Sequence, residues 1–122
     1  MDVLGAHLAY LKSEFGEART ESVAGLTVLV VPNVVVGSGW NRDKVTIRVV
    51  IPAGYPHAHP DCFYVESALA LASGAEPSNS AMQALGPDTY RWFSWHLTSW
   101  DGARDGLLQF IRSCQARLKE AR

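Results

Sequence analysis

The sequence predicts an α+β domain, with a helix near each end of the chain and an antiparallel sheet between them. Apolar side chains recur at helical spacing near both termini, whereas β-branched residues dominate the segments between them. Two helices that flank a run of strands, instead of alternating with single strands, favour an α+β fold over a wound α/β fold.

Composition limits the function classes. A chain of 122 residues is long enough for one core, and we expect residues 1–122 to form a single domain. The net charge of −1 gives no electrostatic basis for binding nucleic acid or an anionic membrane. Two cysteines make no disulfide framework, and the first residues lack a signal-peptide pattern, so we expect a cytoplasmic protein. No cofactor is expected.

The N-terminal segment predicts an amphipathic helix over residues 2–16. Its apolar residues follow a 4-3-4 spacing from Leu4 to Phe15. Asp2 is placed to cap the start of this helix, and Gly16 to end it.

The following segments predict an antiparallel meander of three or four strands. One strand begins after Gly25 and is ended by Pro32, and the apolar character resumes at residues 34–36. The segment 45–50 alternates apolar and polar residues, as a half-buried strand does.

The most distinctive segment is the proline-rich corner that follows this strand. Pro56 and Pro60 have fixed φ angles and keep the preceding residues, Tyr55 and His59, out of the helical region. We therefore expect a rigid, extended corner that leads into a short strand at residues 62–65.

From Ser67 onward the sequence changes character. Residues 74–80 and 86–88 are typical of loops. The segment 89–102 holds three of the four tryptophans and is predicted to cross the sheet irregularly.

The C-terminal segment predicts a second amphipathic helix. Its apolar residues follow a 4-3-4 spacing from Leu107 to Leu118. Asp101 or Asp105 is placed to cap its start.

Two histidines and two cysteines are candidates for metal binding or nucleophilic chemistry. His57 and His59 alternate on an extended segment, so they share a side and suit a metal, but the chain lacks the further ligands of known histidine-pair sites. We interpret them as surface histidines and expect no metal. Cys62 and Cys114 are interpreted as structural, because no basic neighbour is present to activate Cys62.

Ser94 and His96 are the candidate catalytic pair. Two residues apart on an extended segment, they share a side, which lets the imidazole accept the hydroxyl proton. The sequence identifies no acid partner for them. Trp92, Trp95 and Trp100 can be explained as packing for an irregular segment.

The corner and its surroundings resemble the ubiquitin-conjugating enzyme superfamily. In that superfamily a helix and a four-stranded meander are followed by a tyrosine-proline corner with a second proline a few residues later. Tyr55, Pro56 and Pro60 match this corner, an aromatic-containing strand at 62–65 follows it, and Trp100 takes the place of the tryptophan before the closing helices. The resemblance covers nearly the whole chain and implies a ubiquitin-conjugating-enzyme-like fold.

A narrower resemblance is to the divergent bacterial branch of this superfamily. It rests on the corner together with a short set of later residues: Trp92, Ser94, His96, Leu97 and Trp100. Those proteins are found beside genes for an activating enzyme, ubiquitin-like proteins and a JAB-type or related protease. The resemblance therefore implies a ubiquitin-like protein and an activating enzyme as partners, with a deconjugating protease in the same operon.

One departure from the superfamily bears on mechanism. The usual enzymes carry their catalytic cysteine shortly before the tryptophan, but this chain has no cysteine between Cys62 and Cys114. Asn79 is too far upstream to match the asparagine that accompanies that cysteine. A thioester at the usual position is therefore excluded.

Two interpretations of the resemblance remain open. In the first, Ser94 carries the modifier as an oxyester, His96 takes its proton, and Trp92, Trp100 and Asp61 contribute to substrate binding. In the second, the protein is a catalytically inactive variant that acts as a binding scaffold. A protein-interaction domain of the related RWD type is a further alternative.

The resemblance also implies where the activating enzyme docks. By analogy this is the outer face of the first helix, where we expect His7, Lys12 and Glu14 to point outward.

Overall fold

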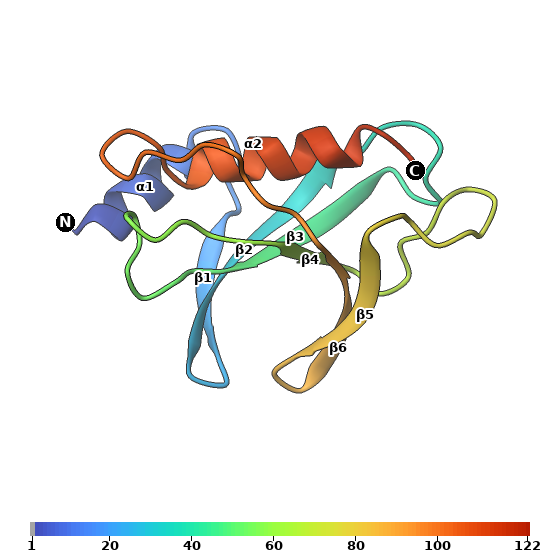
Figure 1. The fold of residues 1–122 in the computed structure, drawn as a ribbon, viewed down its shortest axis with the longest axis horizontal. Coiled ribbons are helices and arrows are strands. Elements are labelled where there is room, and N and C mark those ends of the chain that lie inside the picture. The colour runs from blue at the N-terminus through green and yellow to red at the C-terminus, as the bar shows by residue number, and fades with distance from the viewer. Residues whose placement is uncertain (1) are drawn as a thin grey trace.

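The computed structural model describes residues 2–122 and shows two helices on one face of a six-stranded antiparallel sheet (Figure 1). The elements are α1 (Val3–Lys12), β1 (Arg19–Val23), β2 (Leu26–Val35), β3 (Lys44–Val50), β4 (Phe63–Val65), β5 (Ser80–Leu85), β6 (Asp88–Phe93) and α2 (Leu107–Leu118). In the sheet the strands lie in the order β1-β2-β3-β4-β6-β5. The predicted α+β class is confirmed.

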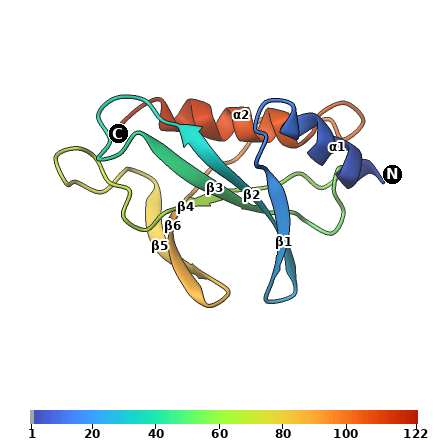
Figure 2. The same cartoon turned by 180° about the vertical axis from the view of Figure 1, so that it is seen from behind.

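The main core lies between the sheet and the helices. Both helices cover the same face, and the β1–β2 and β5–β6 hairpins curve away on the opposite side (Figures 1 and 2). The core side chains with no exposed surface include Leu11, Ile47, Phe63, Phe93 and Phe110. Each contributes roughly 1.5–3 kcal/mol through its burial, so this layer holds the helices in place.

None of the helices in residues 2–122 combines the length and the apolar character that crossing a membrane requires.

The sheet has two more strands than the predicted four-stranded meander. The segment predicted to cross irregularly begins with β6, which forms a hairpin with β5 and pairs with β4. The loop of this hairpin is two residues long, and its first residue, Gly86, has a φ of 61°. A two-residue loop that begins with glycine is a hairpin signal, and it was present in the sequence.

Pro32 does not end its strand, contrary to the prediction. The pairing of β2 with β3 shifts register between Val31 and Val34, and Asn33 has a φ of 61°. This bulge removes Pro32 from the hydrogen-bonded ladder, and the strand continues to Val35.

The predicted helix caps are partly right. The Asp2 carboxylate accepts a hydrogen bond from the Gly5 N–H at 2.7 Å, as expected, but α1 ends at Lys12 instead of residue 16. At α2 the N-cap is Gly106, whose N–H donates to Gln109 Oε1 at 2.9 Å.

Asp101 and Asp105 do not cap α2, because both carboxylates bond within the preceding turn. Asp101 Oδ1 accepts from the Ala103 N–H at 3.0 Å, and Asp105 Oδ2 accepts from the Asp101 N–H at 2.7 Å.

Two buried arginines fix the connections around β6. The Arg91 guanidinium donates to the Leu69 carbonyl at 2.8 Å and to Ser80 Oγ at 3.0 Å. Arg117 on α2 lies over the Phe93 ring, 5.0 Å from its centroid, and donates to the Ser78 carbonyl at 3.0 Å. Because buried guanidinium groups need acceptors, these bonds hold the β4–β5 connection against the sheet and α2.

The C-terminal end of α2 is held by the β2–β3 connection. The Leu118 carbonyl accepts from the Gly37 N–H at 3.0 Å and from Trp40 Nε1 at 2.8 Å. A Cβ atom at Gly37 would lie 2.1 Å from the Lys119 carbonyl oxygen, so only glycine allows this approach.

We expect Gly37→Ala to lower the free energy of unfolding by about 1–3 kcal/mol, the usual scale of overpacking. The added methyl group forces the backbone away from α2. Urea denaturation followed by circular dichroism measures the change. Gly16→Ala is the control, because its Cβ atom would meet nothing closer than 4.0 Å. Equal stabilities for the two variants would contradict this account.

Candidate active site

The candidate site lies where β4 begins and β6 ends. The two strands are antiparallel, with Phe63 opposite Phe93, and the two rings stack with centroids 5.0 Å apart. Just outside this pair, the Cys62 N–H donates to the Trp95 carbonyl at 2.8 Å. The residues that precede β4 are therefore held beside those that follow β6, although some 30 residues separate them along the chain.

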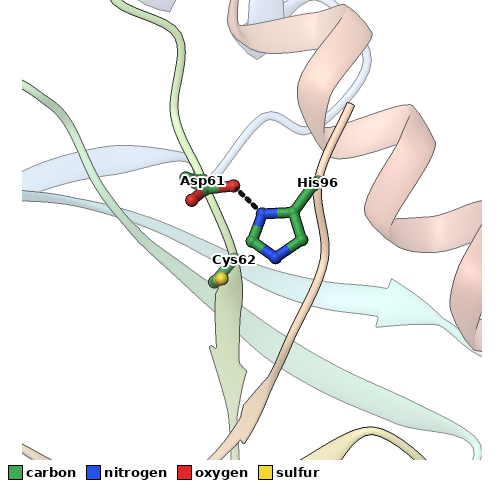
Figure 3. A group of neighbouring side chains, drawn as sticks. All are labelled: Asp61, Cys62 and His96. Atoms are coloured by element: carbon green, nitrogen blue, oxygen red, sulfur yellow. Dashed lines mark hydrogen bonds and ion pairs between the residues drawn. The ribbon is translucent and has the colours of Figure 1, made fainter. Parts of the chain in front are cut away.

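This pairing brings together an aspartate, a histidine and a serine. The distance between His96 Nδ1 and Asp61 Oδ1 is 2.5 Å, and Figure 3 shows the carboxylate directed at the imidazole ring. The other ring nitrogen, Nε2, lies 3.3 Å from Ser94 Oγ. The predicted pair of Ser94 and His96 is thus in contact, and Asp61 contacts the far side of the same ring.

The arrangement sets the direction of a proton transfer. A carboxylate accepts a hydrogen bond from Nδ1–H, which leaves the lone pair of Nε2 facing the serine hydroxyl. A separation of 3.3 Å is loose for such a bond, as is common in enzymes without bound substrate. In chemical terms the three side chains form a hydroxyl, a proton acceptor and a group that orients the acceptor.

These side chains are accessible from outside. The side chains of His96 and Asp61 are 63% and 51% exposed, and Ser94 is half-buried. An ion pair at this exposure contributes little to stability. The hydroxyl is therefore accessible to a large molecule as well as to water.

The two cysteines are poorly suited to act as nucleophiles. Burial raises the pKa of the Cys62 thiol, an effect that its contact with the Trp95 backbone and a hydrogen bond with Trp92 only partly offset. Cys114 has no exposed surface, and burial raises its pKa well above the usual value. The thiolate is the reactive form of cysteine, so both thiols are held in the less reactive state.

The two tryptophans predicted to bind substrate lie in different places. Trp92 is half-buried on β6, two residues before Ser94, and is paired with Tyr64 on β4. Trp100 lies against the proline corner, where its Nε1–H donates to the Pro56 carbonyl at 2.7 Å and its ring approaches His59. Trp92 thus adjoins the serine, whereas Trp100 braces the corner.

The histidines of the corner do not join the site. His57 and His59 are exposed, and His59 Nδ1 lies 2.8 Å from the carbonyl oxygen of Pro60. Within residues 2–122, neither belongs to a group of three or more potential metal ligands.

The expected outward face of the first helix needs correction. His7 is half-buried and hydrogen-bonded through Nδ1 to the Tyr55 hydroxyl at 2.6 Å, while burial raises the pKa of Tyr55 to about 12. Glu14 lies beyond the end of α1 and forms an ion pair with Arg112 on α2. Of the three residues expected to point outward, Lys12 alone is exposed without such a contact within residues 2–122.

The contact between Asp61 and His96 is the feature that sequence analysis left open. From the sequence, Asp61 was expected only to contribute to substrate binding, and no acid partner was identified for Ser94 and His96. The Gly86-Pro87 loop signals the β5–β6 hairpin and so identifies β6 as a strand, but no sequence signal places β6 beside β4. Once β6 is placed beside β4, the residues before one strand must meet the residues after the other.

Comparison with known proteins gives a match to a protein family. The family model described as "Prokaryotic E2 family E" matches residues 6–121 of the chain. Searches of the curated proteins and of the solved structures give no significant match.

The geometry predicts a single tautomer for neutral His96. We expect long-range ¹H–¹⁵N NMR spectra to show the proton on Nδ1, because the Asp61 carboxylate accepts it. Asp61→Ala removes this acceptor and should give a mixture of tautomers.

Asp88→Ala, which removes an exposed carboxylate at the start of β6, is the control and should leave the His96 spectrum unchanged. A neutral His96 protonated on Nε2 in the unmodified protein would contradict the assignment.

Proposed function

The chain belongs to prokaryotic E2 family E, and from that premise we propose that it accepts a ubiquitin-like modifier on Ser94 and passes it to a target. Family membership supports a role in ubiquitin-like conjugation, a conjugating transferase activity, and interaction with ubiquitin-like proteins and activating enzymes in general. The oxyester at Ser94 is the specific part of the proposal.

The observation that carries the proposal is the contact of Ser94 with His96, and of His96 with Asp61, at 3.3 and 2.5 Å. A hydroxyl is a weak nucleophile unless a base accepts its proton. Here the base is within reach and is oriented by a carboxylate. Both thiols, in contrast, are buried with raised pKa values.

The first step is acyl transfer onto the serine. Ser94 Oγ attacks the activated C-terminal carbonyl of the modifier, which the activating enzyme presents, while His96 Nε2 takes the hydroxyl proton. A carbon–oxygen bond forms, and the bond to the carrier breaks. The proton on Nε2 then passes to the leaving group, and Asp61 stabilises the imidazolium that exists between these events.

The second step transfers the modifier to its target by the same route. A nucleophile of the target, such as an amine, attacks the oxyester carbonyl and gives its proton to Nε2. The ester bond breaks, and His96 returns the proton to Ser94 Oγ. The serine and the neutral histidine are regenerated, so the protein gains and loses no proton overall.

The tetrahedral intermediates need hydrogen-bond donors for their oxyanion. Within residues 2–122, the main-chain N–H groups of His96 and Leu97 donate to no backbone or side-chain acceptor. We propose that they serve this purpose. Trp92, beside Ser94, is proposed to cover the modifier's C-terminal residues, and Trp100 to support the corner that borders them.

The surroundings of the site suggest how partners meet it. Because Lys12 at the end of α1 is exposed, α1 is still proposed as the element on which the activating enzyme docks. A JAB-type or related protease encoded in the same operon is proposed to reverse the modification.

A scaffold without catalysis is the second candidate. The exposure of His96 and Asp61 favours it, because the isolated protein does not exclude water from the ester it would carry. In this alternative, whether an inactive conjugating variant or an RWD-like domain, the protein binds its partners without forming an adduct.

We expect Ser94→Ala to abolish the adduct formed with the activating enzyme, the modifier and ATP. The unmodified protein should form an adduct that resists thiol reductants and is cleaved by hydroxylamine, as an oxyester is. Gel electrophoresis with and without each reagent measures this. Ser94→Cys should restore capture as a reductant-sensitive thioester.

Cys62→Ala and Cys114→Ala are the matched controls and should form the adduct as the unmodified protein does. Undiminished adduct on Ser94→Ala would refute the oxyester. Absence of any adduct on the unmodified protein, with intact binding of the modifier, would favour the scaffold.

We expect His96→Gln to slow adduct formation by roughly 100-fold or more, the scale of general base catalysis. The change removes the proton acceptor and leaves Ser94 in place. Single-turnover kinetics measures the rate constant, and His59→Gln is the control that changes a nearby exposed histidine. An unchanged rate in His96→Gln would remove the base from the mechanism.

A further inference from the structure

One group of potential metal ligands lies at the candidate site. A ligand atom from each of Asp61, Cys62 and His96 lies within 4.8 Å of the other two. Figure 3 shows how they meet: Asp61 and Cys62 come from the segment just before β4, and His96 comes from the segment after β6. Acyl transfer at Ser94 makes no use of Cys62.

We propose that these three side chains bind one divalent cation of the Zn²⁺ type. A thiolate sulfur, an imidazole nitrogen and a carboxylate oxygen are all ligands that Zn²⁺ takes in proteins. The sulfur ligand selects against Mg²⁺ and Ca²⁺, which prefer oxygen. Three protein ligands leave a fourth position for water or for a substrate atom.

Binding requires the side chains to shift, because the three ligand atoms lie within 4.8 Å of one another and a tetrahedral Zn²⁺ site holds its ligand atoms roughly 3.3–3.7 Å apart. Zn²⁺ bonds of about 2.0–2.2 Å to nitrogen and oxygen hold two ligands of a tetrahedral site roughly 3.3 Å apart. Asp61 Oδ1 and His96 Nδ1 are 2.5 Å apart, so the cation takes the place of the proton between them and separates them slightly, and the neutral imidazole then carries its proton on Nε2. Both side chains are exposed and can rotate without disturbing the core.

Cys62 is fixed in position for this role. Its φ of 63° places it in the left-handed region, and its N–H is bonded to the Trp95 carbonyl at 2.8 Å. The backbone hydrogen bond joins the segment that carries Cys62 to the segment that carries His96. On binding, the thiol gives its proton to solvent, and the sulfur supplies the third ligand from the buried side of the group.

The cation has a consequence for catalysis, which rests on the proposed function. When Nδ1 of His96 binds the cation, Nε2 no longer has a free lone pair to accept the proton of Ser94. The loaded protein therefore does not activate the serine, and Zn²⁺ acts as a reversible inhibitor of modifier transfer.

Cobalt substitution tests the site on the isolated protein. We expect Co²⁺, added anaerobically with a non-thiol reductant, to give a thiolate-to-metal charge-transfer band that saturates at one equivalent and disappears when Zn²⁺ is added. Cys62→Ala should lose the band, with Cys62→Ser as a second variant of closer shape. His96→Ala should weaken the affinity by at least about tenfold, the scale on which even outer-shell groups act.

Cys114→Ala and His59→Ala are the matched controls and should retain the band and the affinity. Ser94→Ala should retain them too, so a failure of the serine mechanism would not affect this result. Absence of the band in the unmodified protein, its survival in Cys62→Ala and Cys62→Ser, or full affinity in His96→Ala would each overturn the proposal.

Discussion

The candidate site depends on the pairing of β4 with β6. Neither strand is long, and β4 comprises only three residues, but the stacked rings of Phe63 and Phe93 fix their register. Because the strands run antiparallel, the chain before one meets the chain after the other. The hydrogen bond between Cys62 and Trp95 extends this contact by one step. Asp61 and His96 meet as a result, and without the pairing Ser94 and His96 would be a local pair with no acid.

The fold also separates two kinds of nucleophile. The core between sheet and helices contains Cys114, and Cys62 is buried just before β4, so burial raises the pKa of both thiols. The serine stands outside the core, beside a base. In the proposed function the reacting atom is therefore an oxygen instead of a sulfur, and the proposed chemistry is still acyl transfer.

Much of the fold could be predicted from the sequence, because periodicity reports burial. The spacing of apolar residues identified both helices, and the alternation from Val45 to Val50 identified a central strand. The hairpin of β5 and β6 was missed, since the tryptophans in and after β6 and the loop before β5 suggested irregular structure. Its Gly86-Pro87 loop carried the signal. Pro32 misled for a different reason, as a bulge at Asn33 lets the strand pass a residue that normally ends it.

Only the contact between residues close together in the sequence was predictable from the sequence. Ser94 and His96 are two residues apart, so their shared side follows from an extended backbone. The partner of His96 lies 35 residues earlier and depends on strand order, which periodicity does not report. Likewise, the contact of His7 with Tyr55 joins α1 to the proline corner, and the analogy that placed His7 outward could not reveal it.

The central claim is that a hydroxyl carries the modifier. Peptide mapping by mass spectrometry, applied to the unmodified protein after reaction with its activating enzyme, modifier and ATP, tests it most directly. The account predicts the modifier's C-terminal residue linked to the peptide that contains Ser94, at the serine itself. Linkage to Cys62, to Cys114 or to a lysine, with Ser94 unmodified, would contradict it.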